Sequence, residues 1–420
     1  MTVLAILAFA GVLAVVAFDW LHRTKAALVG AGVVVIAGVF GIDEAITAVD
    51  WETLGLLVGM MIIVGLTERT GIFTYLALRV AQLSRGRPFR LVFLLAGTTG
   101  VLSAFLDNLT AILLVVPITL LLADSLDVDP IPLVMTEILA SNIGGTATLI
   151  GDPPNIMIGS HVRELSFVDF IVNLGPVSLV TLVLGTGLVY LFFRRKLDVD
   201  PARAREVAAL DPAEDVRGRP HVKRSIAILL GTIVGFFLHT PLGLEPAVVA
   251  LAGATLLLVV AADDIEEALE RVEWGTIFFF IGLFVLVGAL ESRGVIERIA
   301  EGVNAITGDS VGGQSIGILW IAALGSAAVD NIPFTAAMIP VVDELQAGED
   351  FNDAQWWALA LGACFGGNAT MIAAAANVAA VGVLERTGHP ISFVRFLVIG
   401  VPVTLLSLVI ATLYLLLFQV

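Results

Sequence analysis

Residues 103–155 of this 420-residue chain decide its organisation: they begin SAFLDNLTAILLVVP (103–117) and end SNIGGTATLIGDPPN (141–155). One carboxylate, Asp107, lies inside an apolar run, and a second, Asp152, lies in a run that Gly and Pro interrupt. A charge inside a bilayer is costly, so such a carboxylate indicates a functional site. Gly and Pro that break a spanning helix free backbone carbonyls and amides, which suit ions and polar solutes.

The composition predicts a membrane protein. Hydrophobic residues make up 58% of the chain and charged residues 14%. The apolar runs are long enough for many helices of the about 20 residues that cross a bilayer. The net charge of -16 argues against a nucleic-acid partner. The five histidines fall at span ends or in loops without a metal-binding spacing, so we expect neither an enzyme nor a cofactor.

The opening stretch returns about 223 residues later, which indicates an internal duplication. SAFLDN (103–108) matches SAAVDN (326–331), and GGTATLIGDPPN (144–155) matches GGNATMIAAAAN (366–377). SFVDFIVNLGPV likewise matches SFVRFLVIGVPV, which begins at Ser392. We therefore predict a first repeat over 1–193 and a second over 225–420, joined by a polar linker at 194–224.

Each repeat is predicted to contain the same series of elements. These are three spans, an amphipathic helix, an apolar block with a polar centre, an interrupted helix and a last span. In the first repeat they cover 3–19, 26–42, 52–67, 71–87, 89–123, 131–160 and 168–193. In the second they cover 225–239, 245–261, 273–290, 291–308, 314–346, 355–384 and 392–418.

The topology depends on the two apolar blocks, 89–123 and 314–346. If each is a re-entrant hairpin, each repeat crosses the membrane five times, and an odd number makes the repeats inverted. If each is two full spans, the repeats are parallel. Basic residues concentrate in 68–90 and in the linker, and only the inverted arrangement places both on the cytoplasmic side. We therefore predict an all-α polytopic membrane protein made of two inverted repeats. Each would have about five transmembrane helices, one re-entrant hairpin and one broken helix, with both termini outside and the linker cytoplasmic.

The two hairpin tips carry the pairs Asp107–Asn108 and Asp330–Asn331. In an inverted repeat, two tips that enter from opposite faces meet near the midplane. Asp supplies a charge or a proton and Asn supplies a carbonyl and an amide, so these four residues are a possible Na⁺ site. The alternative is that each Asp only caps the helix that follows it.

The interrupted helices are the second part of the predicted site. Asp152 has no partner in the second repeat, where GDPP has become AAAA, so the site is expected to be asymmetric. The glycines alternatively allow helices to pack closely. The full set of candidate binding residues is Asp107, Asn108, Thr110, Thr146, Thr148, Asp152, Asn155, Asp330, Asn331, Asn368, Thr370 and Asn377. The residues expected to support them are Glu137, Ser141, Asn142, Ser103 and Ser326.

The charge pattern limits the chemical classes of solute that the site could bind. Neither 91–160 nor 311–384 contains Lys or Arg, so three Asp residues are expected to face the pocket without a fixed counter-charge. Such a site favours protons, Na⁺ or a neutral polar solute, and a multiply charged anion would need cations bound first. Cys364 lies just before the second break, where a thiophilic solute could contact it, but a lone buried Cys is more often a small apolar residue.

DNLT after an apolar arm and SNIGGTATLIGDPPN after the next arm resemble the ion transporter superfamily. The chain is most similar to the branch of arsenite-pump-type permeases and the P protein, and the resemblance covers nearly its whole length. Sodium/dicarboxylate symporters and one group of sodium/proton antiporters are more distant relatives. The symporters' Ser-Asn-Thr tips correspond to Asp107–Asn108 and Asp330–Asn331, and their second Pro-Pro-Asn break corresponds to Ala375, Ala376 and Asn377. Asp in place of Ser counts against sodium-coupled carboxylate uptake.

The resemblance implies a homodimer in which transport elements move like an elevator against a scaffold. The scaffold would be 1–87 and 225–310, and the transport elements 88–193 and 311–420. We therefore predict a secondary transporter in a prokaryotic inner membrane, coupled to H⁺ or Na⁺, with arsenite or antimonite efflux favoured. No GxxxxGK[ST] loop is present, so ATP-driven pumping would need a separate ATPase subunit.

Several alternatives remain open: a sodium/proton antiporter, a sodium-coupled di- or tricarboxylate transporter, and an ion channel. An intramembrane aspartyl protease would also use two membrane Asp residues. The Gly-x-Gly-Asp signature of those proteases is absent here, because residues 149–152 read LIGD.

Overall fold

The computed structural model describes residues 1–18, 20–85, 87–195, 197, 202–203, 216, 221–261, 264–308, 310–347 and 351–420. Within these residues every regular element is a helix and none is a strand, so the predicted all-α class is confirmed. Eight of the described helices are long and apolar enough to cross a membrane. Most of the predicted linker at 194–224 lies outside the described residues.

The described residues of the first half form ten helices, most of them close to their predicted positions. The second predicted span, 26–42, is too long, because Gly38 takes a φ of 66° and the helix ends at Ile36. A separate short helix follows it. The helices are α1 (Thr2–Ala17), α2 (Arg23–Ile36), α3 (Ile42–Thr47), α4 (Trp51–Glu68), α5 (Ile72–Ser84), α6 (Pro88–Leu106), α7 (Asn108–Leu126), α8 (Pro130–Gly145), α9 (Pro153–His161) and α10 (Phe167–Phe193).

The second half forms the same series, with one short helix that the sequence did not predict. In the acidic 263–273 segment, the Asp264 side chain accepts from the amides of Glu266 and Glu267 and so starts a helical turn. The helices are α12 (Val222–Leu242), α13 (Pro246–Ala261), α14 (Ile265–Glu270), α15 (Trp274–Glu291), α16 (Val295–Thr307), α17 (Val311–Ala328), α18 (Asn331–Leu345), α19 (Asp353–Gly366), α20 (Ala375–Arg386) and α21 (Phe393–Phe418).

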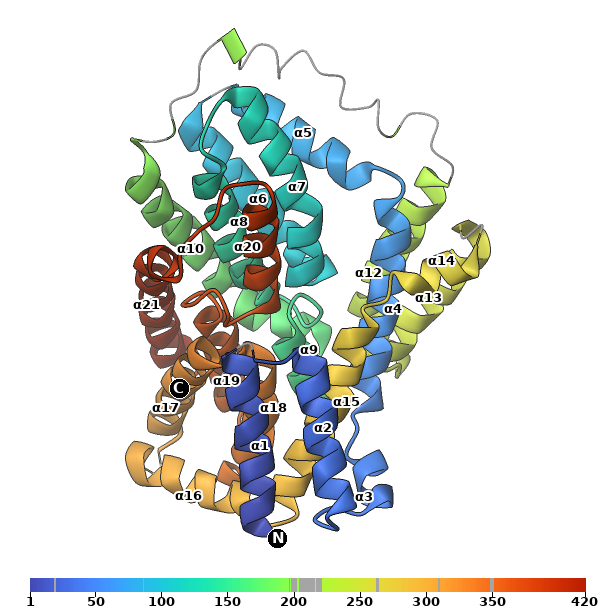
Figure 1. Ribbon diagram of the computed structural model, residues 1–420, viewed down its shortest axis with the longest axis vertical. Coiled ribbons are helices and arrows are strands. Elements are labelled where there is room, and N and C mark those ends of the chain that lie inside the picture. The colour runs from blue at the N-terminus through green and yellow to red at the C-terminus, as the bar shows by residue number, and fades with distance from the viewer. Residues whose placement is uncertain are drawn as a thin grey trace.

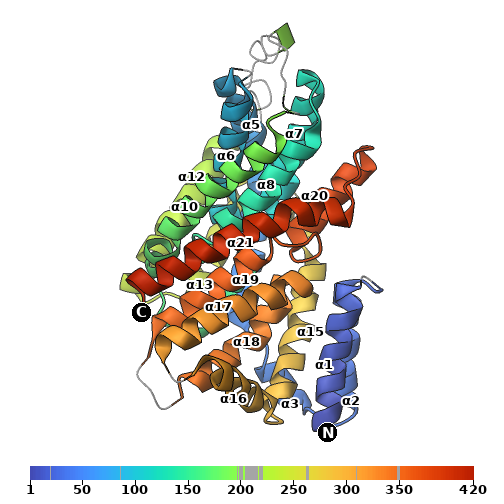
Figure 2. The same ribbon diagram turned by 90° about the vertical axis from the view of Figure 1, so that its left-hand side faces the viewer.

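Two helical hairpins and two broken helices build the centre of the molecule. The α6–α7 hairpin lies towards one end, where α8 and α20 pack beside it, and the α17–α18 hairpin lies towards the other, where α9 and α19 pack beside it (Figures 1 and 2). The amphipathic helices α5 and α16 also lie at opposite ends. The hairpin tips at Asp107 and Asp330 therefore approach the breaks at 146–152 and 367–374. Which end faces the cytoplasm stays a prediction.

Equivalent small residues bring equivalent helices together in the two halves. A Cβ on Gly144 of α8 would lie 2.3 Å from the carbonyl oxygen of Gly100 on α6. A Cβ on Gly366 of α19 would lie 2.5 Å from that of Ala323 on α17. Only Gly allows either approach, because the obstructing atoms are backbone and cannot move aside. These contacts fix the hairpins against the broken helices and so place the tips.

The remaining helices pair in the same repeated manner. α2 packs on α15, and α13, the helix equivalent to α2, packs on α4. Gly282 approaches the backbone of Ala27 in the first pair, and Gly59 approaches that of Ala250 in the second. These pairs belong to the predicted scaffold, whose division from the transport elements stays a prediction.

Candidate functional site

Asp107 forms the tip of the first hairpin in a conformation that favours Gly. Its φ is 80° and its ψ 156°, a backbone region that costs a non-Gly residue about 1–3 kcal/mol. Both carboxylate oxygens are held by one residue: Oδ1 accepts from the Thr110 amide at 2.9 Å and Oδ2 from the Thr110 hydroxyl at 2.7 Å. The tip is therefore capped by its own helix, and capping accounts for both oxygens of Asp107.

Asp330 forms the second tip with a different set of partners. Its Oδ1 accepts from the amide of Ile332 at 2.9 Å. The position equivalent to Thr110 is Pro333, which has neither a hydroxyl nor an amide hydrogen to offer. Oδ2 instead lies 3.8 Å from Nη1 of Arg23, on α2. The prediction that the Asp residues lack a fixed counter-charge is therefore wrong for Asp330, because the tertiary structure brings an Arg from a distant segment.

Four buried Asn side chains join the first hairpin tip to both broken helices. Asn108 donates to Oδ1 of Asn142 at 3.1 Å. Asn142 in turn donates from Nδ2 to Oδ1 of Asn368 and of Asn377, each at 2.9 Å. Asn142 is predicted only as a supporting residue, but its side chain hydrogen-bonds to residues of both halves of the chain.

The two breaks are held open by matched hydrogen bonds. Asn155 donates to the carbonyls of Thr146 and Thr148 at 2.9 and 2.8 Å. Asn377, its equivalent, donates to those of Gly367 and Thr370 at 2.7 and 2.8 Å. The second break therefore persists without prolines, because Asn377 satisfies the carbonyls that the break frees.

Several predicted residues tie the hairpins to the broken helices through their hydroxyl groups. Ser103 donates to the carbonyl of Ser141 at 2.6 Å and the equivalent Ser326 to that of Ala363 at 2.7 Å. Thr148 donates to the Ala104 carbonyl, and Thr370 donates to that of Ala327 at 2.9 Å. Thr146 donates within its own helix end, to the carbonyl of Asn142, at 2.7 Å. All five hydroxyl hydrogens are thus used in packing.

Asp152 breaks the symmetry. It is fully buried, and its Oδ1 accepts from Nδ2 of Asn331 at 3.1 Å, while its Oδ2 has no hydrogen-bond partner. The equivalent residue is Ala374, so the second half has no such carboxylate. Asp107 and Asp330 lie close enough for their charges to act on Asp152. A buried carboxylate with a free oxygen and like charges nearby requires a proton or a cation.

Two further buried groups lie beside this centre. Cys364, the residue equivalent to Asn142, lies 3.7 Å from Oδ1 of Asn155 and so makes the weaker version of the Asn142–Asn377 bond. Glu137 is fully buried on α8, where its Oε1 accepts from the hydroxyl of Thr119 and its Oε2 has no partner. Glu137 therefore pairs with the second arm of the hairpin rather than with its tip.

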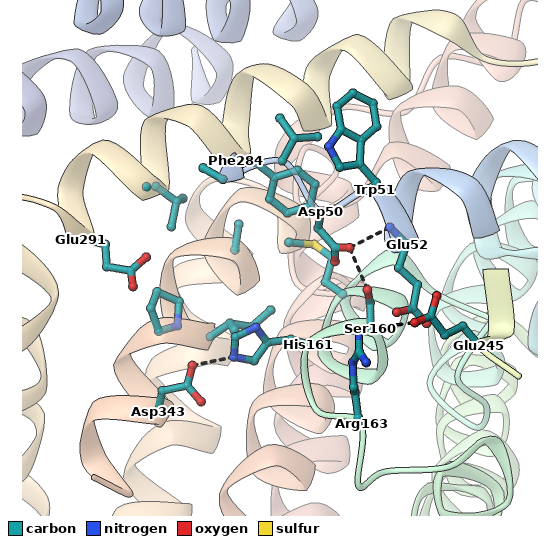
Figure 3. A pocket seen from close by; sticks show the side chains of 18 residues that line it. Asp50, Trp51, Glu52, Ser160, His161, Arg163, Glu245, Phe284, Glu291 and Asp343 are labelled. Carbon is teal, nitrogen blue, oxygen red and sulfur yellow. Dashed lines mark hydrogen bonds and ion pairs between the residues drawn. The ribbon is translucent and has the colours of Figure 1, made fainter. Parts of the chain in front are cut away.

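A cavity of about 580 Å³ opens between the far end of α9 and the helices α4, α15 and α18 (Figure 3). His161 lies 2.5 Å from Oδ2 of Asp343 across it, and Ser160 donates to Oδ1 of Asp50 at 2.8 Å. None of the predicted binding residues lines this cavity. It borders the later turns of α9 and α18, the two helices that begin beside Asp152 and at Asn331.

Burial lowers the pKa of His161, but the hydrogen bond and the negative charge of Asp343 outweigh it, so the pKa lies above the ordinary 6.5. The ion pair joins α9 to α18. Five carboxylates line the cavity, against the two basic residues His161 and Arg163, and Arg163 lies 3.3 Å from Glu245; the carboxylates are those of Asp50, Glu52, Glu245, Glu291 and Asp343. The cavity thus favours cations over anions.

Sequence reasoning missed three residues near the tips: Arg23, Glu273 and Thr276. Arg23 donates to Thr276 Oγ1 at 3.0 Å, and Thr276 donates to Glu273 Oε2 at 3.0 Å. The charge of Glu273 acts on Asp107. Arg23 lies far from the motif segments in the sequence, at the start of a helix of the predicted scaffold. A basic residue at the start of an apolar helix was the only available signal.

Comparison with known proteins agrees with this architecture. The family model CitMHS, described as a citrate transporter, matches residues 13–362. An uncharacterized transporter of Mycobacterium tuberculosis is 41% identical over 422 residues, covering 99% of this chain and 98% of that protein. The P protein of Homo sapiens is 34% identical over 495 residues, covering 98% of this chain and 59% of the P protein.

Among solved structures, the YdaH transporter of Alcanivorax borkumensis is similar with a TM-score of 0.56. The similarity covers 87% of this chain and 85% of that one at 17% sequence identity, so it concerns the fold alone. The resemblance to the P protein that the sequence motifs indicated is confirmed. The chain therefore belongs to the CitMHS family, and it is an integral membrane transporter.

Proposed function

We propose that this protein is a secondary-active transporter coupled to H⁺ or Na⁺, and that Asp152 binds the coupling ion. The single observation that supports this is the free Oδ2 of a fully buried Asp152, next to Asn331 and under the charges of two further Asp residues. An uncompensated buried charge is costly, so the carboxylate gains most from a small cation or a proton. Asp107, Asn108, Asp330 and Asn331 would surround the ion.

The proposed mechanism is alternating access by an elevator movement. The transport elements 88–193 and 311–420 would carry the ion and the solute past the scaffold of 1–87 and 225–310, in a homodimer. The polar centre supports this, because it is built almost wholly from hairpins and broken helices that hydrogen-bond to one another. The proposal places the protein in a prokaryotic inner membrane, with both termini outside. An ATPase subunit would be a further partner if the transporter works as an arsenite pump.

For the solute we propose a small inorganic species of the arsenite or antimonite type. Arsenite is neutral as the hydroxide at neutral pH, so it would meet no repulsion from Asp107, Asp152 and Asp330. Sodium/proton exchange is the second candidate, supported by the same free oxygen of Asp152. The family description names citrate, and a citrate anion would have to enter together with cations, because Arg23 is the one cation paired with these carboxylates among the described residues.

The test is transport in liposomes that contain a pH-sensitive dye. Separate pulses of Na⁺, arsenite and citrate are applied outside, and a change of lumenal pH identifies the solute that exchanges with protons. Asp152→Asn should abolish the response, whereas the matched control Asp124→Asn, which removes an exposed carboxylate from α7, should leave it intact. A response to Na⁺ alone would identify an antiporter. An intact response in Asp152→Asn would contradict the role of Asp152, and unitary currents would contradict alternating access.

A further inference from the structure

The cation at Asp330 is supplied by a helix that does not belong to the hairpin. Arg23 is the first residue of α2, where a positive charge is unfavourable because the helix dipole already places positive potential there. Its guanidinium donates to Thr276 at 3.0 Å and lies 5.4 Å from the ring centre of Phe279. Thr24 also donates to the carbonyl of Gly275 at 2.7 Å, so the start of α2 is fixed to α15.

The approach to Asp330 is electrostatic rather than a hydrogen bond. Nη1 of Arg23 lies 3.8 Å from Oδ2, beyond hydrogen-bond distance, while the other end of the guanidinium stays on Thr276. The side chain of Asp330 is 7% exposed, so the pair is screened far less than a surface pair. Such a pair attracts strongly and yet can separate without breaking a directed bond.

The asymmetry between the tips explains why Oδ2 of Asp330 has no hydrogen-bond partner within its own hairpin. At the first tip Thr110 occupies both oxygens of Asp107. At the second, Pro333 can occupy neither, and Arg23 faces the oxygen that the missing hydroxyl leaves. One tip is thus self-contained, while the other depends on a charge from outside the hairpin.

We propose that Arg23 is a fixed counter-ion that neutralises Asp330 in the cation-free carrier, and that a cation bound at this tip replaces it. The replacement rests on the proposed function, whereas the ion pair itself does not. The bound cation would release the second hairpin from α2 and α15, and its loss would restore the contact. Three other acidic residues bear on the same centre: Asp107, Asp152 and Glu273.

The test is a double-mutant cycle of thermal stability on the purified full-length protein, at mildly alkaline pH with choline as the only salt cation. Arg23→Gln should lower the melting temperature, because it leaves a buried carboxylate unpaired. Adding Asp330→Asn should recover most of the loss. Lys25→Gln, which removes an exposed cation from the same helix, should have no effect. Pro333→Thr restores the partner found at the first tip and should shrink the cost of Arg23→Gln. If the effects of Arg23→Gln and Asp330→Asn on the melting temperature are additive, the two side chains do not interact and the proposal is wrong.

Replacing choline with Na⁺ then tests the competition. Na⁺ should stabilise the wild type and reduce the coupling between Arg23 and Asp330. The Na⁺ concentration that gives half of the stabilisation should fall about fivefold in Arg23→Gln. If Na⁺ stabilises the protein while the coupling between Arg23 and Asp330 stays unchanged, the cation does not replace Arg23 and this part of the proposal is wrong. If Na⁺ has no effect but the coupling in choline stands, sodium coupling in the proposed function fails and the counter-ion role of Arg23 remains.

Discussion

Asn331, at the tip of the second hairpin, donates from Nδ2 to Oδ1 of Asp152, at the break of the first broken helix, over 3.1 Å. The two residues are 179 positions apart and come from opposite halves of the chain. The bond leaves the other oxygen of Asp152 free. It therefore joins the repeats at a buried carboxylate that has no counterpart in the second half.

Asn331→Ala should weaken cation binding, because it removes an amide oxygen of the proposed ion site together with the donor that holds Oδ1 of Asp152 in place. We expect a loss of about 1–3 kcal/mol in the free energy of unfolding and a smaller stabilisation by Na⁺. Melting curves with and without Na⁺ measure both quantities. Asn173→Ala on α10 is a suitable control, since Asn173 bonds to Gln419 rather than to the centre. An unchanged response to Na⁺ in Asn331→Ala would argue that Asp152 does not bind the cation.

Asn142→Ala should be much more destabilising than Cys364→Ala, although the two positions are equivalent. Asn142 makes one bond to Asn108 and two to the second broken helix. Cys364 offers only a thiol, a weak donor, which lies 3.7 Å from Oδ1 of Asn155 and also interacts with Asp152. We expect a cost of about 3 kcal/mol or more for the first and about 1–2 kcal/mol for the second. Urea or thermal unfolding in detergent compares them, and equal costs would contradict the role of Asn142 as a bridge.

Gly144→Ala should displace the first hairpin. The new Cβ would lie 2.3 Å from a backbone oxygen of Gly100, so α6 and α8 must separate. A cost of about 3 kcal/mol, at the upper end for overpacking, is expected together with loss of transport. Gly97→Ala on α6, the partner helix of this crossing, adds a Cβ that meets nothing within 4 Å and should be neutral or slightly stabilising. Normal transport by Gly144→Ala would show that this crossing does not position the tip.

The His161–Asp343 pair should make stability depend on pH. The folded pKa of His161 is raised above 6.5, so its contribution is complete below the unfolded pKa and is lost as pH rises through the folded value. The melting-temperature difference between wild type and His161→Gln should therefore be largest below the ordinary pKa of 6.5 and shrink as the pH rises through the raised pKa of His161. His389→Gln, which removes an exposed histidine elsewhere, should show no such trend. A difference that grows with pH would reverse the assigned direction.

The elements that carry the centre could be predicted from the sequence because their signals are local. Gly and Pro interrupt the helix between α8 and α9 whatever the tertiary structure, and the Asp–Asn pair after an apolar arm starts a new helix at both tips. The duplication then identified the second break although its prolines are gone. The sequence also established that Asp152 has no equivalent, since that comparison needs only the aligned repeats. By itself it thus determined the helical class, the hairpins, the breaks and the unpaired carboxylate.

Only the tertiary structure decided which of these groups meet. Asn142 bonds to residues 226 and 235 positions away, and Arg23 reaches Asp330 from another pair of helices. Such contacts depend on how rigid helices are placed against one another, and that placement follows from close packing at Gly144, Gly366, Gly59 and Gly282. No local pattern encodes it. The sequence therefore located the carboxylates, and the packing of the helices decided which of them received a counter-charge.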